Sequence, residues 1–412
     1  MKLPYDPATC TFLGTTTGKR PVFTADNAKN GFVCGTTGSG KTVVLSNYVR
    51  RAVEKDFPAL IIDGKGDTGP GSLLDIVQKL HGDKKVYVIN MTDPQHSDKY
   101  NPFRNASPTI AKDMLINLTD WSEEHYKLNT ERYLQRLVYL LHMAEIPLTF
   151  QNIIKYMGTE QFKALSATLL HAELLTKADH AMNTELLKSS GRIAENALAR
   201  FATIAESELG QIFDDTGIDI YTAIQENAII LFILNPLIYP ELSPLMGRLI
   251  TIDSKKAISN LYQSGNGRTF FIMDEINVYA STALVDLVNK SRSANVTCIL
   301  ATQSLSDLDA AVNEAYKEQI IENCNNYVVL RQNSSINAEH WANILGTRET
   351  LEVTHQLQQT ATGATETGFG SAKRVREYLY HPDDIKALQT GKGFFLSRDL
   401  NTHCKINIHK PF

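Results

Sequence analysis

Short runs of apolar residues recur along the chain, each bounded by Gly, Pro, Asp or Asn. Because successive positions in a run are apolar, both faces of such a strand would be buried, as in a parallel sheet covered by helices. Helical stretches such as residues 41–56 follow some of the runs, and this alternation predicts a doubly wound α/β fold, a mostly parallel sheet with helices on both faces. The seven runs span residues 31–34, 59–63, 85–90, 228–234, 269–274, 296–301 and 327–331.

The middle of the chain has a different pattern. From Asn105 to Ser190 it holds one glycine, Gly158, and it is rich in Leu, Ala, Glu and Lys. Residues 130–145 and 149–157 place apolar side chains at helical spacing. We therefore expect an all-helical domain at 104–210, inserted between a first part of the core at 1–103 and a second part at 211–412. The apolar helical faces are either the core of this domain or a docking surface, and they include Leu134, Leu137, Val138 and Leu141.

Residues 354–374 are polar, rich in Gly, Thr and Gln, and without a period. A loop of this length in a compact domain is either functional or mobile. We expect it to line a channel, to close over a neighbouring subunit or to serve as a flexible surface linker.

The formal charge gives no overall sign of a nucleic-acid partner, since 41 basic and 45 acidic residues leave a net charge of −4. Any DNA contact must come from local patches or from several subunits around one channel. Each short basic cluster is by default a solvated face. The clusters are Arg50-Arg51, Lys84-Lys85, Lys255-Lys256 and residues 373–376.

Cysteine usage and hydropathy indicate a cytoplasmic protein. The five cysteines are scattered and show no CxxC or Cys/His ligand spacing, so neither a disulfide framework nor a zinc site is expected. The longest apolar run, at 228–234, is far shorter than the ~20 residues that span a bilayer. The first residues lack the charged and then apolar layout of a signal peptide.

Residues 35–42, GTTGSGKT, fit the phosphate-loop pattern GxxxxGK[ST] at every position. An apolar run precedes the motif and an amphipathic helical stretch follows it, which is the context that the motif requires. Its glycines allow backbone N–H groups to turn toward phosphate oxygens at a helix N-terminus. We expect Lys41 to reach the β- and γ-phosphates, Thr42 to bind Mg²⁺, and the nucleotide to be ATP, since no NKxD motif is present. The binding residues are Gly35, Thr36, Thr37, Gly38, Ser39, Gly40, Lys41 and Thr42.

A pair of carboxylates follows the run at 269–273. Asp274 at the end of a strand would hold the Mg²⁺ shell, and Glu275 would take a proton from the attacking water. The alternative is a strand followed by an acidic helix start.

Two further polar positions are candidates for the same chemistry. Gln303 follows the run at 296–301 and would either sense the γ-phosphate or satisfy a loop backbone. Arg292 lies between the acid-bearing run and this one, where it would either reach a neighbouring subunit's nucleotide or remain a surface residue. Arg331 is its rival.

The turn IIDGKGD at 61–67 is open to two interpretations. Its polar side chains, Asp63, Lys65 and Asp67, follow a strand at the edge where ligands gather. A glycine-stabilised turn capped by its own Asp accounts for it equally well.

Together these motifs resemble the type IV secretion coupling proteins, the TraG/TraD family of conjugative ATPases within the FtsK/HerA group. The resemblance covers about residues 14–400, and it is carried by GTTGSGKT (35–42), IIDGKGD (61–67), YNPF (100–103), IMDE (272–275), ATQS (301–304) and VREYLYHPDDIKAL (375–388). It implies a RecA-like core with an inserted all-helical domain, working as a homo-hexameric ring that hydrolyses ATP to move DNA. It also implies that Arg292 is the arginine finger and that Gln303 senses the nucleotide.

The resemblance further implies several partners. These are DNA, single-stranded in the reading that we favour, a relaxase or secreted protein bound through the helical domain, and a membrane-anchored secretion component. Many members carry N-terminal transmembrane helices, and no such run precedes the phosphate loop, so the isolated chain is expected to be monomeric unless a partner supports the ring. The alternatives are a nucleotide-switched receptor for secreted proteins and a double-stranded DNA translocase of the FtsK/HerA type.

Overall fold

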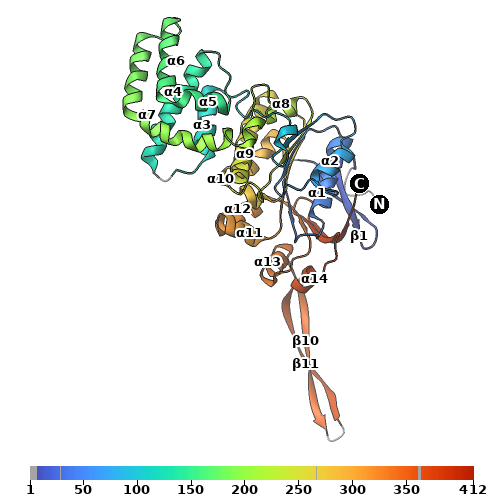
Figure 1. Ribbon diagram of the computed structural model, residues 1–412. Coiled ribbons are helices and arrows are strands. Elements are labelled where there is room, and N and C mark those ends of the chain that lie inside the picture. The colour runs from blue at the N-terminus through green and yellow to red at the C-terminus, as the bar shows by residue number, and fades with distance from the viewer. Residues whose placement is uncertain (1–6, 28, 122, 266, 361–362) are drawn as a thin grey trace.

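The computed structural model describes residues 7–27, 29–121, 123–265, 267–360 and 363–412. A large twisted sheet forms the centre, a group of helices projects from one side of it, and a long hairpin projects from another (Figure 1). Among the described residues no helix is long and apolar enough to cross a membrane.

The central sheet has 11 strands in the order β2-β1-β13-β12-β9-β3-β8-β7-β4-β6-β5. From β9 to β5 all neighbours are parallel, and these seven strands coincide with the seven apolar runs of the sequence, so the predicted α/β fold class is confirmed. The remaining four strands are antiparallel. The strands are β1 (Cys10–Thr16), β2 (Pro21–Ala25), β3 (Gly31–Cys34), β4 (Ala59–Asp63), β5 (Val86–Asn90), β6 (Ile229–Ile233), β7 (Thr269–Met273), β8 (Val296–Thr302), β9 (Asn326–Val329), β12 (Lys392–Ser397) and β13 (Thr402–Ile408).

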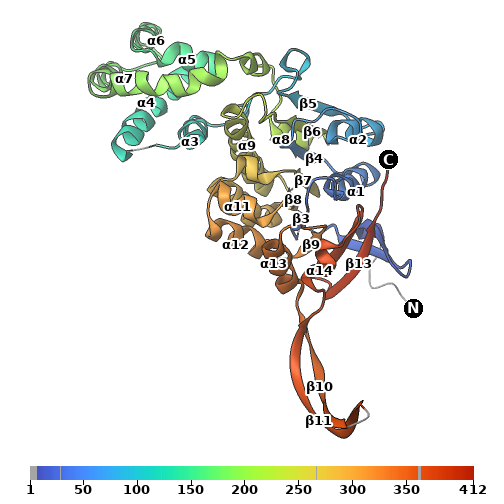
Figure 2. The ribbon, with the colours of Figure 1, turned by 60° about the horizontal axis from the view of Figure 1, so that its bottom comes forward.

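Helices cover both faces of the sheet, and the sheet separates two apolar cores (Figure 2). On one face the side chains of α1 and α2 pack on alternate residues of the strands, such as Ile61 and Ile272. On the other face Leu60 and Phe271 point to α9 and the helices that follow it. The core helices are α1 (Lys41–Glu54), α2 (Leu73–Leu80), α8 (Ile220–Gln225), α9 (Leu242–Ser264), α10 (Thr282–Ser291), α11 (Leu305–Ala311), α12 (Glu314–Glu322), α13 (Ser335–Leu345) and α14 (Pro382–Lys386).

Five helices form a separate group between β5 and β6, at the far side of α9 (Figure 1). Their interior holds Leu134, Leu137, Val138 and Leu141, each fully buried. These apolar faces are therefore the core of the helical group and not a docking surface. The helices are α3 (Pro108–Leu118), α4 (Glu124–Met143), α5 (Phe150–Met157), α6 (Thr159–His171) and α7 (Lys177–Ala205).

Residues 354–374 were expected to form a loop, and that expectation is wrong for the part that is described. β10 (Thr347–Thr360) pairs antiparallel with β11 (Gly363–Tyr378) in a two-stranded ribbon that extends from the core (Figure 2). The ribbon buries neither face of its base, where Leu351 and Val353 are 62% and 53% exposed. Without a buried face there is no reason for the alternation by which strands are identified in a sequence.

A buried charge cluster holds the chain where it enters the helical group. Lys256 of α9 lies 2.8 Å from Asp219 and 2.9 Å from Asp253. The hydroxyl of Tyr100 donates to Asp253 at 2.9 Å, and Lys256 also donates to the carbonyl of Pro102 at 2.8 Å. Burial raises the pKa of Asp253 to about 6. The YNPF segment is thereby fixed to α9 by charges that have little access to water.

We expect Lys256→Met to lower the free energy of unfolding by about 3–5 kcal/mol, because it leaves two buried carboxylates without their cation. Urea denaturation checks this value. The matched control is Lys255→Met, which removes a partly exposed ion pair with Asp286 and should cost less than about 1 kcal/mol. Equal losses in the two variants would contradict the anchoring role of the cluster.

Candidate functional site

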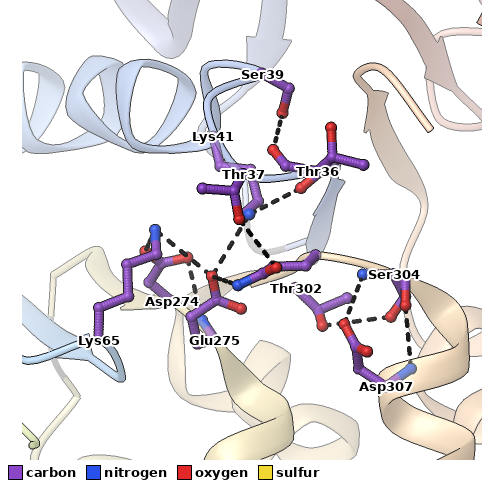
Figure 3. A network of polar contacts seen from close by, with 12 residues as sticks. Thr36, Thr37, Ser39, Lys41, Lys65, Asp274, Glu275, Thr302, Ser304 and Asp307 are labelled. Atoms are coloured by element: carbon purple, nitrogen blue, oxygen red, sulfur yellow. Dashed lines mark hydrogen bonds and ion pairs between the residues drawn. The ribbon is translucent and has the colours of Figure 1, made fainter. Parts of the chain in front are cut away.

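The sequence motifs meet at one edge of the sheet because the strands that carry them are parallel neighbours. β3, β8, β7 and β4 lie side by side, and each motif directly follows the carboxyl end of its strand. The phosphate loop follows β3, Gln303 follows β8, the acid pair follows β7 and the IIDGKGD turn follows β4. Figure 3 shows the polar network that results.

The phosphate loop is tied to the strands on both sides of β3. The amide of Gly35 donates to the carbonyl of Thr302 at 3.3 Å, and the amide of Thr36 donates to that of Arg331 at 3.0 Å. The Ser39 hydroxyl closes the loop by donating to the Thr36 carbonyl at 2.6 Å. The loop is therefore held to the sheet by its own backbone.

The loop leads into α1 through glycines with left-handed backbone. Gly38 and Gly40 have φ of 73° and 111°, values that residues other than glycine rarely adopt. Lys41 begins α1, and its ammonium group donates to the Gly35 carbonyl at 2.8 Å. Thr42 follows it and is half-buried.

A segment that sequence analysis missed also lies on the loop. Gly391 donates its amide to the Ser39 carbonyl oxygen at 3.0 Å, and Thr390 donates its hydroxyl to the Gly38 carbonyl oxygen at 3.0 Å.

The acid pair faces the phosphate loop (Figure 3). Glu275 Oε1 lies 3.4 Å from Lys41 Nζ and accepts a hydrogen bond from Gln303 Nε2 at 3.2 Å. Glu275 Oε2 is buried and has no hydrogen-bond partner among the described residues. Burial and the charge of Asp274 raise the pKa of Glu275, while Lys41 and Lys65 oppose that rise. One oxygen of this carboxylate is thus held by two contacts, and the other is left unpaired among the described residues.

Glu275 adopts a left-handed backbone with φ of 49°, which is strained for a residue with a side chain. Its backbone lies against the β4 turn so closely that a Cβ at Gly64 would stand 2.8 Å from the Glu275 Cβ. The glycine of IIDGKGD is therefore required for the approach of the turn to the acid pair.

The same turn supports both interpretations of its sequence. Asp63 accepts the amide of Lys65 at 2.9 Å, so it caps its own turn as the simpler interpretation predicted. Burial, followed by the charge of Asp274, raises the pKa of Asp63 to about 7. Lys65 instead extends to the end of the neighbouring strand β7, where its ammonium group lies 2.8 Å from Asp274 Oδ2. Asp67 stays in the turn and accepts the amide of Gly69.

Gln303 connects the acid pair with the phosphate loop. Its amide nitrogen donates to Glu275, and its amide oxygen accepts the Thr37 hydroxyl at 3.1 Å. A movement of Thr37 would therefore displace Gln303 and alter its hydrogen bond to Glu275, as a nucleotide sensor requires.

The two candidate arginines lie at opposite ends of the parallel strands, Arg292 before the start of β8 and Arg331 after the end of β9. Arg292 is exposed at the end of α10, just before β8 begins, and so lies away from the phosphate loop of its own chain. Arg331 follows β9 beside that loop, with its Nε buried and without a hydrogen-bond partner among the described residues. An arginine that acts on a neighbouring subunit must be exposed, and of the two Arg292 alone is exposed.

The residues present fit a nucleotide with Mg²⁺. Carboxylate and hydroxyl oxygens are the ligands that Mg²⁺ prefers, and Asp274 and Thr42 supply one of each. No cluster of three or more His, Cys, Asp or Glu that could hold a metal occurs in the described part of the chain. The protein would thus contribute few ligands, as is usual where phosphate oxygens and water complete the shell.

In three of the four basic clusters both members form ion pairs within the chain. The fourth lies on the exposed base of the β10–β11 ribbon, where Arg374 pairs with Glu349 at 3.4 Å. Lys373, Arg374 and Arg376 are all exposed there. The pairs in the other clusters are Arg50–Glu54, Arg51–Asp26, Lys84–Asp56, Lys85–Glu226, Lys255–Asp286 and Lys256–Asp219.

A family model described as the type IV secretion-system coupling protein DNA-binding domain matches residues 15–409. In sequence, 101 residues of the chain are 32% identical to an uncharacterized protein of Mycoplasma pneumoniae (strain ATCC 29342 / M129 / Subtype 1), over 24% of this chain and 67% of that protein.

Solved structures of two proteins share the fold. The bacterial conjugative coupling protein TrwBdeltaN70, in an unbound form, gives a TM-score of 0.67 at 17% identity over 99% of this chain and 90% of its own. The plasmid coupling protein TrwB in complex with ADP and Mg²⁺ gives 0.67 at 17% identity over 97% and 89%. VirB4 of Thermoanaerobacter pseudethanolicus gives 0.62 at 13% identity over 98% and 97%. The core therefore has the RecA-like fold that the sequence motifs predicted.

Proposed function

The chain belongs to the type IV secretion-system coupling protein family, and on that premise we propose that it hydrolyses ATP to move relaxase-bound DNA toward the secretion channel. One observation carries this proposal: Lys41 of the phosphate loop and Gln303 both contact one oxygen of Glu275 and leave its other oxygen buried and free. That arrangement supplies a phosphate-binding loop and a positioned base in one site.

We assign the binding of the nucleotide to residues 35–42 and that of Mg²⁺ to Thr42 and Asp274. Bound ATP with Mg²⁺ supplies the phosphoanhydride whose cleavage releases the free energy for movement. Lys41 balances negative charge on the phosphates, and Glu275 accepts a proton from water at Oε2. Gln303 links that base to Thr37 of the loop and so couples the state of the nucleotide to the acid pair.

We further propose that DNA is contacted at the base of the β10–β11 ribbon. Lys373, Arg374 and Arg376 lie there on one strand, and α14 with residues 389–391 connects that strand to the phosphate loop. The acidic net charge of the chain makes a single patch weak. Because phosphate contacts add with the number of charges, several copies around one channel would bind strongly, which favours the hexameric ring.

The remaining partners follow from the family and from exposed side chains. We place the relaxase or another secreted protein on the helical group, where six large apolar side chains are exposed among the described residues. A membrane-anchored secretion component would hold the assembly at the cytoplasmic face of the membrane. The six side chains are Ile110, Tyr126, Leu128, Tyr139, Leu174 and Met182.

We expect single-stranded DNA to accelerate ATP hydrolysis and Glu275→Gln to lower kcat by about 10²–10⁴-fold while ATP binding persists, because the variant loses only the base. Phosphate release and binding of a fluorescent ATP analogue measure the two quantities. The matched control is Glu185→Gln, whose side chain is 73% exposed on α7. Acceleration by duplex DNA alone would indicate a translocase of the FtsK/HerA type, and binding without turnover would indicate a nucleotide-switched receptor.

Replacing Lys373, Arg374 and Arg376 together by Ala should weaken binding of single-stranded DNA and reduce the slope of log affinity against log salt by about 2, since each phosphate contact contributes about 0.7. Fluorescence anisotropy at several salt concentrations measures both. Replacing Lys155, Lys163 and Lys177 of the helical group by Ala removes the same charge elsewhere and should leave the slope unchanged. An equal effect of both triple variants would exclude the ribbon as the DNA contact.

The role of Arg292 can be separated from that of Arg331 by mixing inactive variants. We expect Arg292→Ala and Lys41→Ala to be inactive alone and to regain part of the ATPase rate when mixed, because an intact phosphate loop then meets an intact Arg292 on the neighbouring subunit. Arg331→Ala mixed with Lys41→Ala should stay inactive, since Arg331 acts within its own chain. The opposite pattern would identify Arg331 as the arginine finger.

A further inference from the structure

Lys65 is a second cation at the acid pair, in addition to the lysine of the phosphate loop. Its ammonium group lies 2.8 Å from Asp274 Oδ2 and 3.5 Å from Glu275 Oε1 (Figure 3). The side chain of Lys65 is 33% exposed, whereas those of Asp274 and Glu275 are 1% and 4% exposed. The partly exposed side chain of Lys65 thus contacts two buried carboxylates.

The turn that carries Lys65 is held rigidly in place. The Lys65 amide donates to Asp63, and Gly66 has φ of 74° at a point where a Cβ would stand 2.5 Å from the carbonyl oxygen of Leu234. On its other side, Gly64 lies directly against Glu275. Little freedom remains for the backbone, so the turn holds the Cα of Lys65 beside the acid pair, within reach of both carboxylates.

Glu275 Oε1 is consequently contacted by three groups from three different strand ends. Lys41 lies 3.4 Å away, Gln303 3.2 Å and Lys65 3.5 Å. Three contacts on one oxygen fix the plane of the carboxylate and keep Oε2 free. Asp274, in contrast, forms its ion pair with Lys65 and with no other cation among the described residues.

We propose that Lys65 is a positioning residue for hydrolysis, which orients Glu275 and competes with divalent metal for Asp274. The two effects have opposite signs. Loss of the ammonium group loosens the base and slows turnover, but it also removes a positive charge next to a metal-binding carboxylate and strengthens the attraction of a divalent cation. If Lys65 had a merely structural role, its replacement would lower both the turnover rate and the affinity for the divalent metal.

The test compares wild type with Lys65→Met. We expect kcat for ATP to fall about 10–100-fold with little change in KM, because a loosened base affects turnover more than ATP binding. We expect the affinity of the ADP-saturated protein for Mn²⁺, followed by the electron paramagnetic resonance of free Mn²⁺, to rise about three- to tenfold. Lys65→Arg retains the charge and should keep the wild-type Mn²⁺ affinity and recover part of the rate.

Lys79→Met is the control, since it removes a lysine on the following helix whose ion pair with Asp75 lies at the surface, and it should change neither quantity. Unchanged Mn²⁺ affinity and rate in Lys65→Met, or a fall in both, would overturn the role assigned to Lys65. The inference rests on the proposed function, and the wild-type protein separates the two: if it binds no ADP and releases no phosphate, the proposed function fails and the role of Lys65 fails with it.

Discussion

The parallel alignment of β3, β8, β7 and β4 is the constraint on which the site depends. Parallel strands end at the same edge of a sheet, so residues far apart in sequence arrive within hydrogen-bonding distance of one another. Lys65 and Asp274 are 209 positions apart and lie in contact for this reason. Each group at this edge is positioned by a different strand, and Glu275 is the residue that they share.

The two faces of this sheet explain why the rest of the molecule is arranged as it is. Strands buried on both sides need helices above and below, and α1 and α9 provide the largest parts of these layers. On the α9 side, Lys256 uses its charge to fix the segment from which the helical group departs. The nucleotide site thus lies at the carboxyl ends of the parallel strands, and the base of the helical group is attached to α9 on one face of the same sheet.

The sequence predicted the seven parallel strands because each is an uninterrupted apolar run, and it predicted the members of the site because the phosphate loop and the acid pair have characteristic local patterns. The antiparallel strands, such as β1 and β13, were not predicted, since neither is an uninterrupted apolar run and neither alternates strictly between buried and exposed positions. The β10–β11 ribbon was not predicted either, because neither face of its base is buried and its sequence therefore lacks a regular apolar pattern. Lys65 was named only as part of a turn, because no local pattern shows which distant carboxylate a lysine will meet.

We propose that this edge of the sheet converts ATP hydrolysis into movement along DNA. The most direct measurement is the release of streptavidin from the end of a biotinylated single-stranded oligonucleotide, with ATP or with a non-hydrolysable analogue. We expect release that requires ATP and is absent with the analogue. Hydrolysis that DNA accelerates without any release of streptavidin, from either end of the strand, would contradict it.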